Sequence, residues 1–225
     1  MITYNFTTKH DGNIAFHVND NENKVLANRL ALEKKYNINV KNLKYMNQTH
    51  GCNIHIVTKD SKKCLDDCDA IITNEVNLPL MVMVADCIPI LIYDENKNVI
   101  AAVHAGRNST FLKIVEKTIL KMIEIFDCKI NNIKVVLGPS IKKCCYEVSE
   151  ELENIVINSF GKEFSDNRYI DLQKINKKQL VDIGVKASNI SISNICTKCS
   201  GKDYYSYRLN NKCGRFSGII EINKE

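Results

Sequence analysis

The chain of 225 residues has no segment that approaches the roughly 18 uninterrupted apolar residues of a membrane-spanning helix. Its first residues lack the basic region and long apolar core of a secretory signal peptide, which favours a cytoplasmic location. It has only three prolines and nine glycines, and no repeat, low-complexity stretch or linker divides it. Since 44% of the residues are hydrophobic, we expect one domain over residues 1–225 with one sizeable core.

The charge distribution argues against nucleic-acid and membrane partners. The formal net charge is +5, and the lysines are spread along the chain rather than clustered. Neither a basic stripe nor an aromatic platform is evident, so the charge is typical of a solvated surface. A mildly basic protein still favours anionic substrates such as phosphate. For the oligomeric state we expect a monomer or a weak homo-oligomer.

The ten cysteines are many for a chain without an export signal. Their irregular spacing favours free, buried thiols over disulfides. Cys196 and Cys199 form a lone CxxC motif, and its only near neighbour is Cys213. The adjacent Cys144 and Cys145 are poorly placed to hold one metal ion together. We therefore expect neither a second metal site nor a redox pair, and the sequence assigns no role to Cys196, Cys199 or Cys213.

Apolar periodicity predicts a mixture of helices and strands. Helices are expected over residues 25–36, 111–126, 150–160 and 174–183, and strands over 54–57, 69–73, 80–85, 90–93, 99–103, 133–137, 190–195 and 216–222. Ser109 and Thr110 are the expected N-caps of the second helix, and Gly184 is expected just after the last one. The continuous apolar runs suit strands buried on both faces. We therefore predict an α/β or α+β fold with a central mixed sheet.

Three potential metal ligands stand out: His50, Cys87 and His104. His104 follows an apolar run and precedes an expected helix, and such strand-to-helix junctions often hold ligands in α/β sheets. Two imidazoles and one thiolate leave the fourth position of a zinc ion open for water or substrate, as in catalytic zinc sites. Each residue alone has a plainer interpretation, as a hydrogen-bonded surface histidine or a buried thiol.

Other polar residues accompany this set. Asp86 directly precedes Cys87, and such a carboxylate can orient an imidazole, move protons or simply cap a strand end. Asp69 has the same alternatives. Arg208 and Arg215 are two of few arginines, and a planar guanidinium suits a phosphate or a carboxylate, although surface salt bridges are the plainer interpretation.

The ordered set of motifs carries more information than any single residue. The motifs are, in chain order, Gln48-x-His50-Gly51, Asp69-Ala70, Ala85-Asp86-Cys87-x-Pro89, His104-Ala105-Gly106, Leu137-Gly138-Pro139-Ser140-Ile141, Tyr146-Glu147-Val148, Asp171-Leu172, Cys196-Thr197, Tyr205-Ser206-Tyr207-Arg208 and Gly214-Arg215. From about residue 40 to the end, this series resembles the YfiH-type family, also called the laccase-domain or polyphenol oxidoreductase family. Its members are regarded as zinc-dependent purine nucleoside phosphorylases.

The resemblance implies a single-domain, layered α/β/α/β fold similar to that of deamidase toxins with a Cys-His pair. It implies phosphorolysis of adenosine, inosine, guanosine and methylthioadenosine to the free base and ribose 1-phosphate, and deamination of adenosine to inosine. The zinc ligands would be His50, Cys87 and His104. With zinc activating water or phosphate attacking the ribose, we expect catalytic roles for His50, Cys87, His104 and Asp86 and substrate contacts from Asp69, Arg107, Arg208 and Arg215.

The chain departs from the family pattern directly after the third ligand. Trp-Arg usually follows His-Ala-Gly, whereas this chain has Arg107-Asn108 and contains no tryptophan. Either the basic group has moved by one position or its contact is lost. The ligand set is untouched, so we expect metal binding to survive, with the effect falling on substrate range and rate.

Three alternatives stay open. Two histidines and a cysteine are also a blue-copper set, as a copper-dependent polyphenol oxidase would use. A multicopper laccase needs many more imidazoles, however, and of five histidines His10, His17 and His55 look unconnected. The second alternative is a metal-free hydrolase with Cys87 as nucleophile and His104 as base. The third is a binding module without enzymatic activity.

Overall fold

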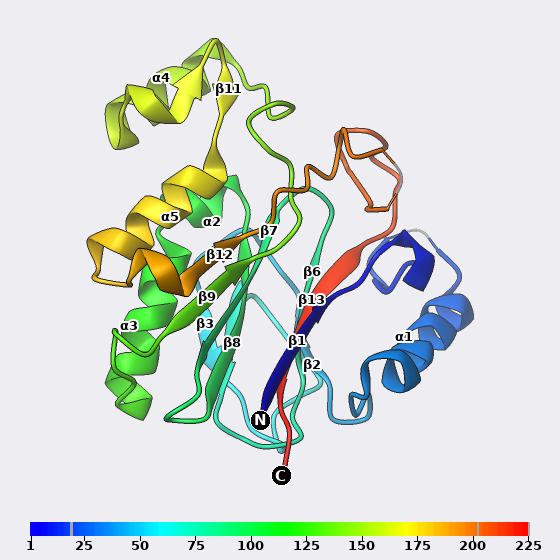
Figure 1. Cartoon of the computed structure of the whole chain (residues 1–225). Helices are drawn as coiled ribbons and strands as arrows, with labels where there is room; N and C mark the ends of the chain where they lie inside the picture. Colours follow the sequence, from blue (N-terminus) through cyan, green and yellow to red (C-terminus); the bar gives the residue numbers. More distant parts are fainter. Residues whose placement is uncertain (19, 202, 225) are drawn as a thin grey trace.

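Two β-sheets pack face to face at the centre of the computed structural model, which describes residues 1–18, 20–201 and 203–224 (Figure 1). The five-stranded sheet has the order β1 (Ile2–Phe6), β13 (Phe216–Ile222), β6 (Leu80–Val84), β2 (Lys44–Met46), β4 (Cys64–Leu65). The six-stranded sheet has the order β12 (Ile190–Ile192), β9 (Lys134–Leu137), β7 (Ile88–Asp94), β8 (Val99–Ala105), β5 (Ala70–Thr73), β3 (Ile54–Ile56). Both sheets mix parallel and antiparallel pairs.

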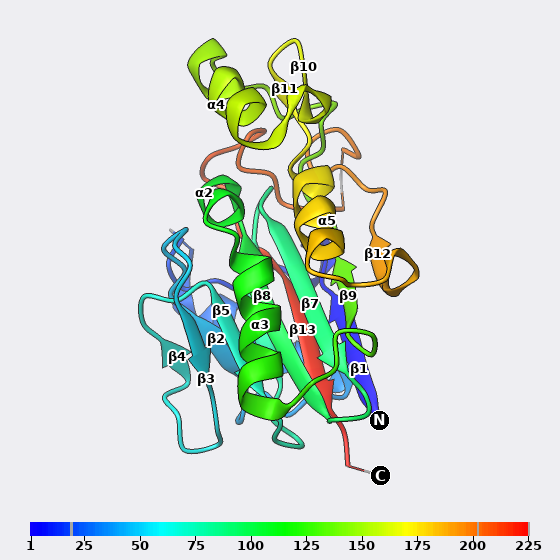
Figure 2. The same ribbon diagram turned by 90° about the vertical axis from the view of Figure 1, so that its left-hand side faces the viewer.

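The helices of the described ranges are α1 (Glu22–Tyr36), α2 (Arg107–Phe111), α3 (Ile114–Phe126), α4 (Glu150–Phe160) and α5 (Leu172–Asp182). Short 3₁₀ turns lie at Lys9–Asp11, Lys162–Phe164 and Ala187–Asn189. A small hairpin of β10 (Ser165–Asp166) and β11 (Tyr169–Ile170) accompanies α4. In Figure 2, α3 and α5 lie over the six-stranded sheet, while α1 lies against the other sheet in Figure 1. None of the helices in the described ranges is long and apolar enough to cross a bilayer.

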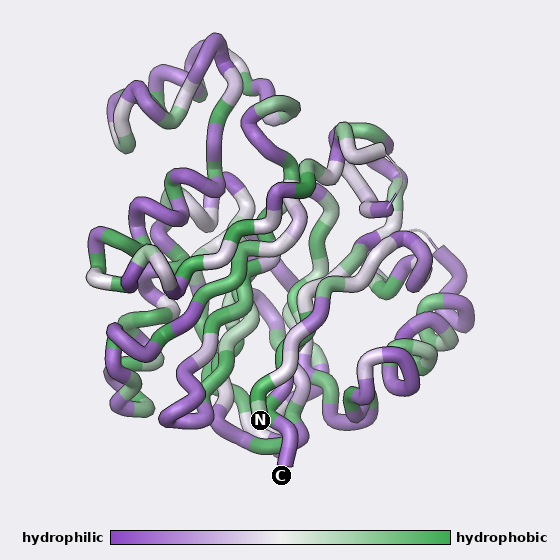
Figure 3. The backbone as a smooth tube through the Cα atoms, viewed as in Figure 1, coloured by the Kyte–Doolittle hydropathy of each residue, from purple (hydrophilic) through white to green (hydrophobic). Residues whose placement is uncertain are grey.

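The central strands are buried on both faces, as their continuous apolar runs predict. In β6, Leu80, Val82 and Val84 point into the layer between the sheets, whereas Met81 and Met83 pack in the layer beneath α1. The tube in Figure 3 shows the resulting concentration of hydrophobic residues along the strands. The mixed α/β class is therefore confirmed, and helices and sheets are stacked in layers, as the resemblance implied.

The helix expected over residues 111–126 is instead two helices. α2 ends at Phe111 and α3 begins at Ile114, with Lys113 between them in the left-handed conformation at φ 60°. Ser109 and Thr110, the expected N-caps, lie buried inside α2. The Gln179 side-chain amide in α5 donates to the Thr110 carbonyl at 2.9 Å and compensates for the interrupted helical ladder. The interruption sets α2 apart as a short element beside the end of β8.

The other boundaries agree with the expected ones to within a few residues. Gly184 follows α5 at φ 99°, in the left-handed conformation that favours glycine at this position. The strands β1, β2 and β4 were not among the expected ones, because their short segments carry little apolar signal. That residues 1–225 form one domain stays a prediction.

Candidate active site

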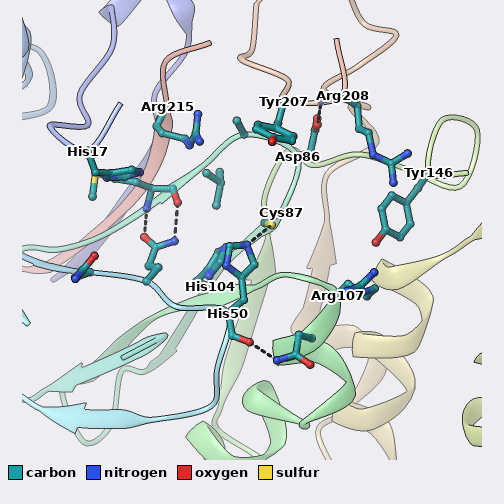
Figure 4. Close-up of a pocket in the computed structure, with 16 residues that line it drawn as sticks. His17, His50, Asp86, Cys87, His104, Arg107, Tyr146, Tyr207, Arg208 and Arg215 are labelled. Atoms are coloured by element: carbon teal, nitrogen blue, oxygen red, sulfur yellow. Dashed lines mark hydrogen bonds between the residues drawn. The ribbon is translucent and has the colours of Figure 1, made fainter. Parts of the chain in front are cut away.

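The three ligand candidates converge at one end of the two sheets (Figure 4). The ligand atoms of His50, Cys87 and His104 all lie within 4.8 Å of one another. The Cys87 Sγ atom is 3.8 Å from His50 Nε2, and the two imidazole ring centroids are 4.7 Å apart. Residues from three separate segments thus form the cluster that the sequence predicted.

Local backbone structure explains this convergence. β6 belongs to one sheet and β7 to the other, and Cys87 lies in the turn that joins them. Asp86 makes this turn sharp, because it adopts φ 89°. β7 and β8 then pair antiparallel with Pro89 opposite His104, so the beginning of β7 and the end of β8 lie side by side.

The loop that carries His50 is held to the same end by side-chain amides. The Gln48 amide acts like a strand edge, donating to the Met83 carbonyl at 2.8 Å and accepting from the Met83 N–H at 2.9 Å. The Asn108 side chain in α2 donates to the His50 carbonyl at 2.7 Å. His50 itself has φ 60°, so its backbone conformation depends on these restraints.

Asp69 is the buried anchor of the cluster. Its carboxylate accepts hydrogen bonds from His104 Nδ1 at 2.7 Å, from the His50 N–H at 3.0 Å and from the Gly51 N–H at 2.7 Å. The bond to Nδ1 leaves Nε2 of His104 free to face Cys87, as in metal-bound histidines supported by a carboxylate. Burial raises the pKa of Asp69, but the hydrogen bond and charge of His104 lower it below the usual value.

Asp69 therefore does not fit the substrate contact expected of it. Its side chain is completely buried and does not line the pocket beside the cluster. The geometry agrees with the other alternative, in which this carboxylate orients an imidazole.

Cys87 and His104 polarise each other strongly. Burial raises the pKa of the Cys87 thiol, but the charge of His104 and hydrogen bonds to both imidazoles bring it down to about 6. Burial lowers the pKa of His104, but the charge of Cys87 and the bond to Asp69 raise it to about 9. A thiolate beside an imidazolium is favoured near neutral pH, and thiolate is the form in which cysteine binds metals or attacks electrophiles.

The space beside the cluster fits a metal ion. A Cβ atom on Gly106 would lie 2.9 Å from His50 Cδ2 and 3.1 Å from Cys87 Sγ, so only glycine leaves room at this position. The donors are two imidazole nitrogens and one sulfur from one side of a cavity, the arrangement of a three-ligand catalytic zinc site. The residues therefore fit the implied metal.

The cluster opens into a pocket of about 580 Å³, large enough for a ligand of nucleoside size. Of the expected substrate contacts, Arg107, Arg208 and Arg215 line it. So do Tyr146 and Tyr207, which lie in motifs that the resemblance used but were assigned no role. Figure 4 shows these basic and aromatic side chains around the space above the cluster. Arg107 thus keeps a basic group in the pocket despite the changed motif.

His17, which looked unconnected in the sequence, lines the pocket. β1 ends at Phe6, and a loop brings His17 to the pocket wall. Burial lowers the pKa of His17, and the charge of Arg215 lowers it further, so the neutral imidazole is favoured. No local pattern in the sequence points to this residue.

Asp86 lines the pocket, but its carboxylate is engaged. One oxygen accepts from Thr197 Oγ1 at 2.7 Å and the other from the Arg208 N–H at 2.7 Å. These bonds tie three distant segments together at the pocket wall. The geometry favours a positioning role over the movement of protons.

The positions of the cysteines differ from two expectations, that the adjacent Cys144 and Cys145 are poorly placed to hold one metal ion and that the thiols are buried. Cys144 and Cys145 lie with Cys196 and Cys199, all four Sγ atoms within 4.8 Å of one another, and Cys144 and Cys199 are exposed rather than buried. Cys213, the neighbour expected from the sequence, lies instead beside Arg215. The chain turns tightly here, because the Lys142 carbonyl accepts both the Cys145 and Tyr146 N–H groups. This turn directs the thiols of Cys144 and Cys145 towards Cys196 and Cys199.

Comparisons with known proteins agree with this geometry. The family model described as multi-copper polyphenol oxidoreductase laccase matches residues 5–223. A purine nucleoside phosphorylase of Clostridium acetobutylicum is 43% identical over 191 residues, 81% of this chain and 78% of that protein. The adenosine deaminase RL5 of an unknown prokaryotic organism is 28% identical over 228 residues, 92% of this chain and 86% of that protein. The crystal structure of Bacillus licheniformis YfiH superposes with a TM-score of 0.93 at 26% identity, covering 99% and 93% of the two chains.

Proposed function

The chain belongs to the multi-copper polyphenol oxidoreductase laccase family, and within it we propose that this protein is a zinc-dependent purine nucleoside phosphorylase with adenosine deaminase activity. The observation that carries the proposal is the His50, Cys87 and His104 cluster at the base of a pocket of about 580 Å³. Relatives that match most of the chain bear these two enzyme names. The chain is thus an enzyme, and the binding-module alternative is set aside.

Zinc suits the cluster better than the copper of the family description. Within the described ranges, the groups of potential ligands are the His50, Cys87 and His104 cluster and the four cysteines 144, 145, 196 and 199. A multicopper oxidase needs further imidazole clusters for its additional copper ions. His55 is exposed on β3 and His10 pairs with Asp203 at 3.5 Å, so neither joins the cluster.

A bound zinc ion supplies Lewis-acid chemistry that lowers the pKa of water towards neutrality, which hydrolytic deamination at C6 of adenine requires. Asp69 holds His104 in the tautomer with Nε2 directed at the cluster. Tyr146 lies in the pocket wall, and burial raises the pKa of its phenol, which favours the neutral, hydrogen-donating form. These residues would orient the base over the cluster and help exclude water from the remaining pocket.

Phosphorolysis needs a second recognition element for phosphate. Arg107 and Arg208 line both the main pocket and an adjoining cleft that also holds Arg168. Arginine forks bind phosphate oxygens through strong, paired hydrogen bonds. We place the phosphate there, so that its oxygen attacks C1′ of the ribose as the C1′–N9 bond breaks. The leaving purine takes the proton that hydrogen phosphate gives up. The products are the free base and ribose 1-phosphate.

The test is incubation of the zinc-loaded protein with adenosine, with and without phosphate. Inosine without phosphate would report deamination, and adenine or hypoxanthine formed only with phosphate would report phosphorolysis. His50→Ala removes one proposed ligand and should abolish both, whereas Cys64→Ser, a thiol outside both clusters, should abolish neither. The proposal fails if the zinc-loaded protein forms none of these products.

One observation favours a second candidate, the metal-free hydrolase. Cys87, His104 and Asp69 form a continuous thiolate, imidazole and carboxylate series, as in enzymes with a cysteine nucleophile. In that case His50 is a spectator. Full activity after chelation, with rapid alkylation of Cys87 in native protein, would favour this candidate over the zinc enzyme.

A further inference from the structure

Four thiols from two distant loops gather outside the candidate active site. Cys144 and Cys145 follow β9, and Cys196 and Cys199 follow β12. The Cys144 Sγ atom lies 3.8 Å from Cys145 Sγ and 3.7 Å from Cys199 Sγ. All four sulfur atoms lie within 4.8 Å of one another. We call residues 144, 145, 196 and 199 the four-cysteine cluster.

The sulfur spacing is that of ligands around one tetrahedral ion. Zinc–sulfur bonds of about 2.3 Å place the four sulfurs of a regular tetrahedron about 3.8 Å apart. Two of the separations in the four-cysteine cluster, 3.7 and 3.8 Å, match this edge. A disulfide requires only about 2.05 Å between sulfurs, and an iron–sulfur cubane separates its thiolates more widely than a single ion does. The geometry therefore selects one ion.

We propose that the four-cysteine cluster is a second metal site, which holds one structural zinc ion. Four protein thiolates close the coordination sphere and leave no position for substrate, which is the arrangement of structural zinc sites. Soft thiolate ligands also select zinc over magnesium or calcium. This proposal does not depend on the one made for the pocket.

The loops that carry the thiols are already joined by the backbone. Ser140 and Cys196 form a parallel bridge, and the Thr197 N–H donates to the Ser140 carbonyl at 3.1 Å. The Cys145 N–H donates to the Lys142 carbonyl at 2.9 Å in the tight turn that directs both adjacent thiols to one place. The ligands are thus held in position before any ion binds.

The surroundings suit the charge of such a site. Four thiolates and one Zn²⁺ carry a net charge of −2, and Lys142, Lys143 and Lys198 are sequence neighbours of the ligands. The backbone N–H groups of Cys199, Lys142 and Lys198 are directed at the Cys196 sulfur. N–H groups directed at a sulfur support a metal-bound thiolate. The exposed Cys144 and Cys199 leave an entry path for the ion.

The site would fix part of the pocket wall. Tyr146, which lines the pocket, directly follows Cys145. Thr197, within the CxxC turn, donates to Asp86 at 2.7 Å, and Asp86 precedes Cys87. An ion at the four-cysteine cluster therefore clamps the two loops that position Tyr146 and Asp86.

Metal analysis of variants tests the proposal. The protein is purified under reducing conditions and its zinc measured by mass spectrometry against protein concentration. We expect two zinc ions per chain in the wild type and one in His50→Ala. We also expect one in the double variant Cys144→Ser, Cys199→Ser, and two in the control Cys64→Ser. Because the two clusters are emptied separately, failure of one proposal does not mimic failure of the other.

Cobalt substitution and hydrogen exchange give independent readouts. The sulfur-to-cobalt charge-transfer band should lose most of its intensity in the double variant and little in His50→Ala. Amide exchange in residues 142–146 and 196–200 should accelerate at least tenfold in the double variant, and no more than twofold in His50→Ala. Unchanged zinc content in the double variant would overturn the proposal. So would a Cys144–Cys199 disulfide in place of the second ion, or iron instead of zinc.

Discussion

The substitution Asp69→Asn separates the anchor of the active site from its metal ligands. The carboxylate of Asp69 receives four donors in a buried place: His104 Nδ1 and the N–H groups of Thr49, His50 and Gly51. An asparagine keeps one acceptor oxygen, but its NH₂ group then faces at least two of these donors. Each unsatisfied buried donor costs about 1–3 kcal/mol, so the free energy of unfolding should fall by roughly 2–6 kcal/mol.

The same change should weaken zinc binding by roughly 10- to 100-fold, because His104 loses the partner that holds its tautomer. The affinity is measured by competition with a chromophoric chelator, and the free energy of unfolding by urea denaturation of the metal-free protein. The matched control is Asp67→Asn, in the same loop but exposed, where Asp67 accepts from Thr49 Oγ1 at 2.8 Å. Equal zinc affinities for the two variants would refute the role assigned to Asp69.

Three further predictions follow from single residues. Gly106→Ala places a Cβ 2.9 Å from His50 Cδ2, so chelator competition should show at least a tenfold loss of zinc affinity. An unchanged affinity would contradict the claim that only glycine leaves room for the metal ion at position 106. Arg208→Gln should raise the KM for phosphate roughly tenfold, because the loss of one charge-assisted hydrogen bond weakens binding by about that factor. The kinetics of deamination should stay unchanged, and equal effects on both reactions would count against a phosphate contact. Burial raises the pKa of Glu221 from 4.5 to about 7, so the folded state keeps a proton that the unfolded state has lost. The free energy of unfolding should therefore fall by at most about 3 kcal/mol between about pH 4.5 and pH 7, and urea unfolding of Glu221→Gln should show no such fall.

Local patterns predicted the parts of the fold that local forces determine. The runs 80–85, 90–93 and 99–103 predict strands buried on both faces because none of them contains a charged residue. The division between α2 and α3 at Lys113 escaped prediction, since the apolar stripe continues across it. The contact that compensates for the break comes from Gln179 in α5, which lies far along the chain.

In the candidate site, too, residues within sequence motifs were predicted and a residue outside any motif was not. The order of motifs identified His50, Cys87 and His104, and the structure brings them together. His17 could not be found, because a loop without a pattern carries it to the pocket.

The four-cysteine cluster was missed for a related reason. Sequence distance pointed to Cys213 as the partner of the CxxC motif, but parallel pairing of β9 with β12 brings the segments after these strands together. That pairing spans more than fifty residues and has no signature in either segment alone.

The most direct test of the central claim is metal reconstitution with two substrates in parallel. Chelator-stripped protein is reloaded with zinc or with copper, and each form is given adenosine with phosphate, or a simple phenol with oxygen. We expect zinc to restore the formation of inosine and free purine base, His50→Ala not to respond to zinc, and neither metal form to oxidise the phenol. Phenol oxidation restored by copper, with no nucleoside product from the zinc form, would contradict it.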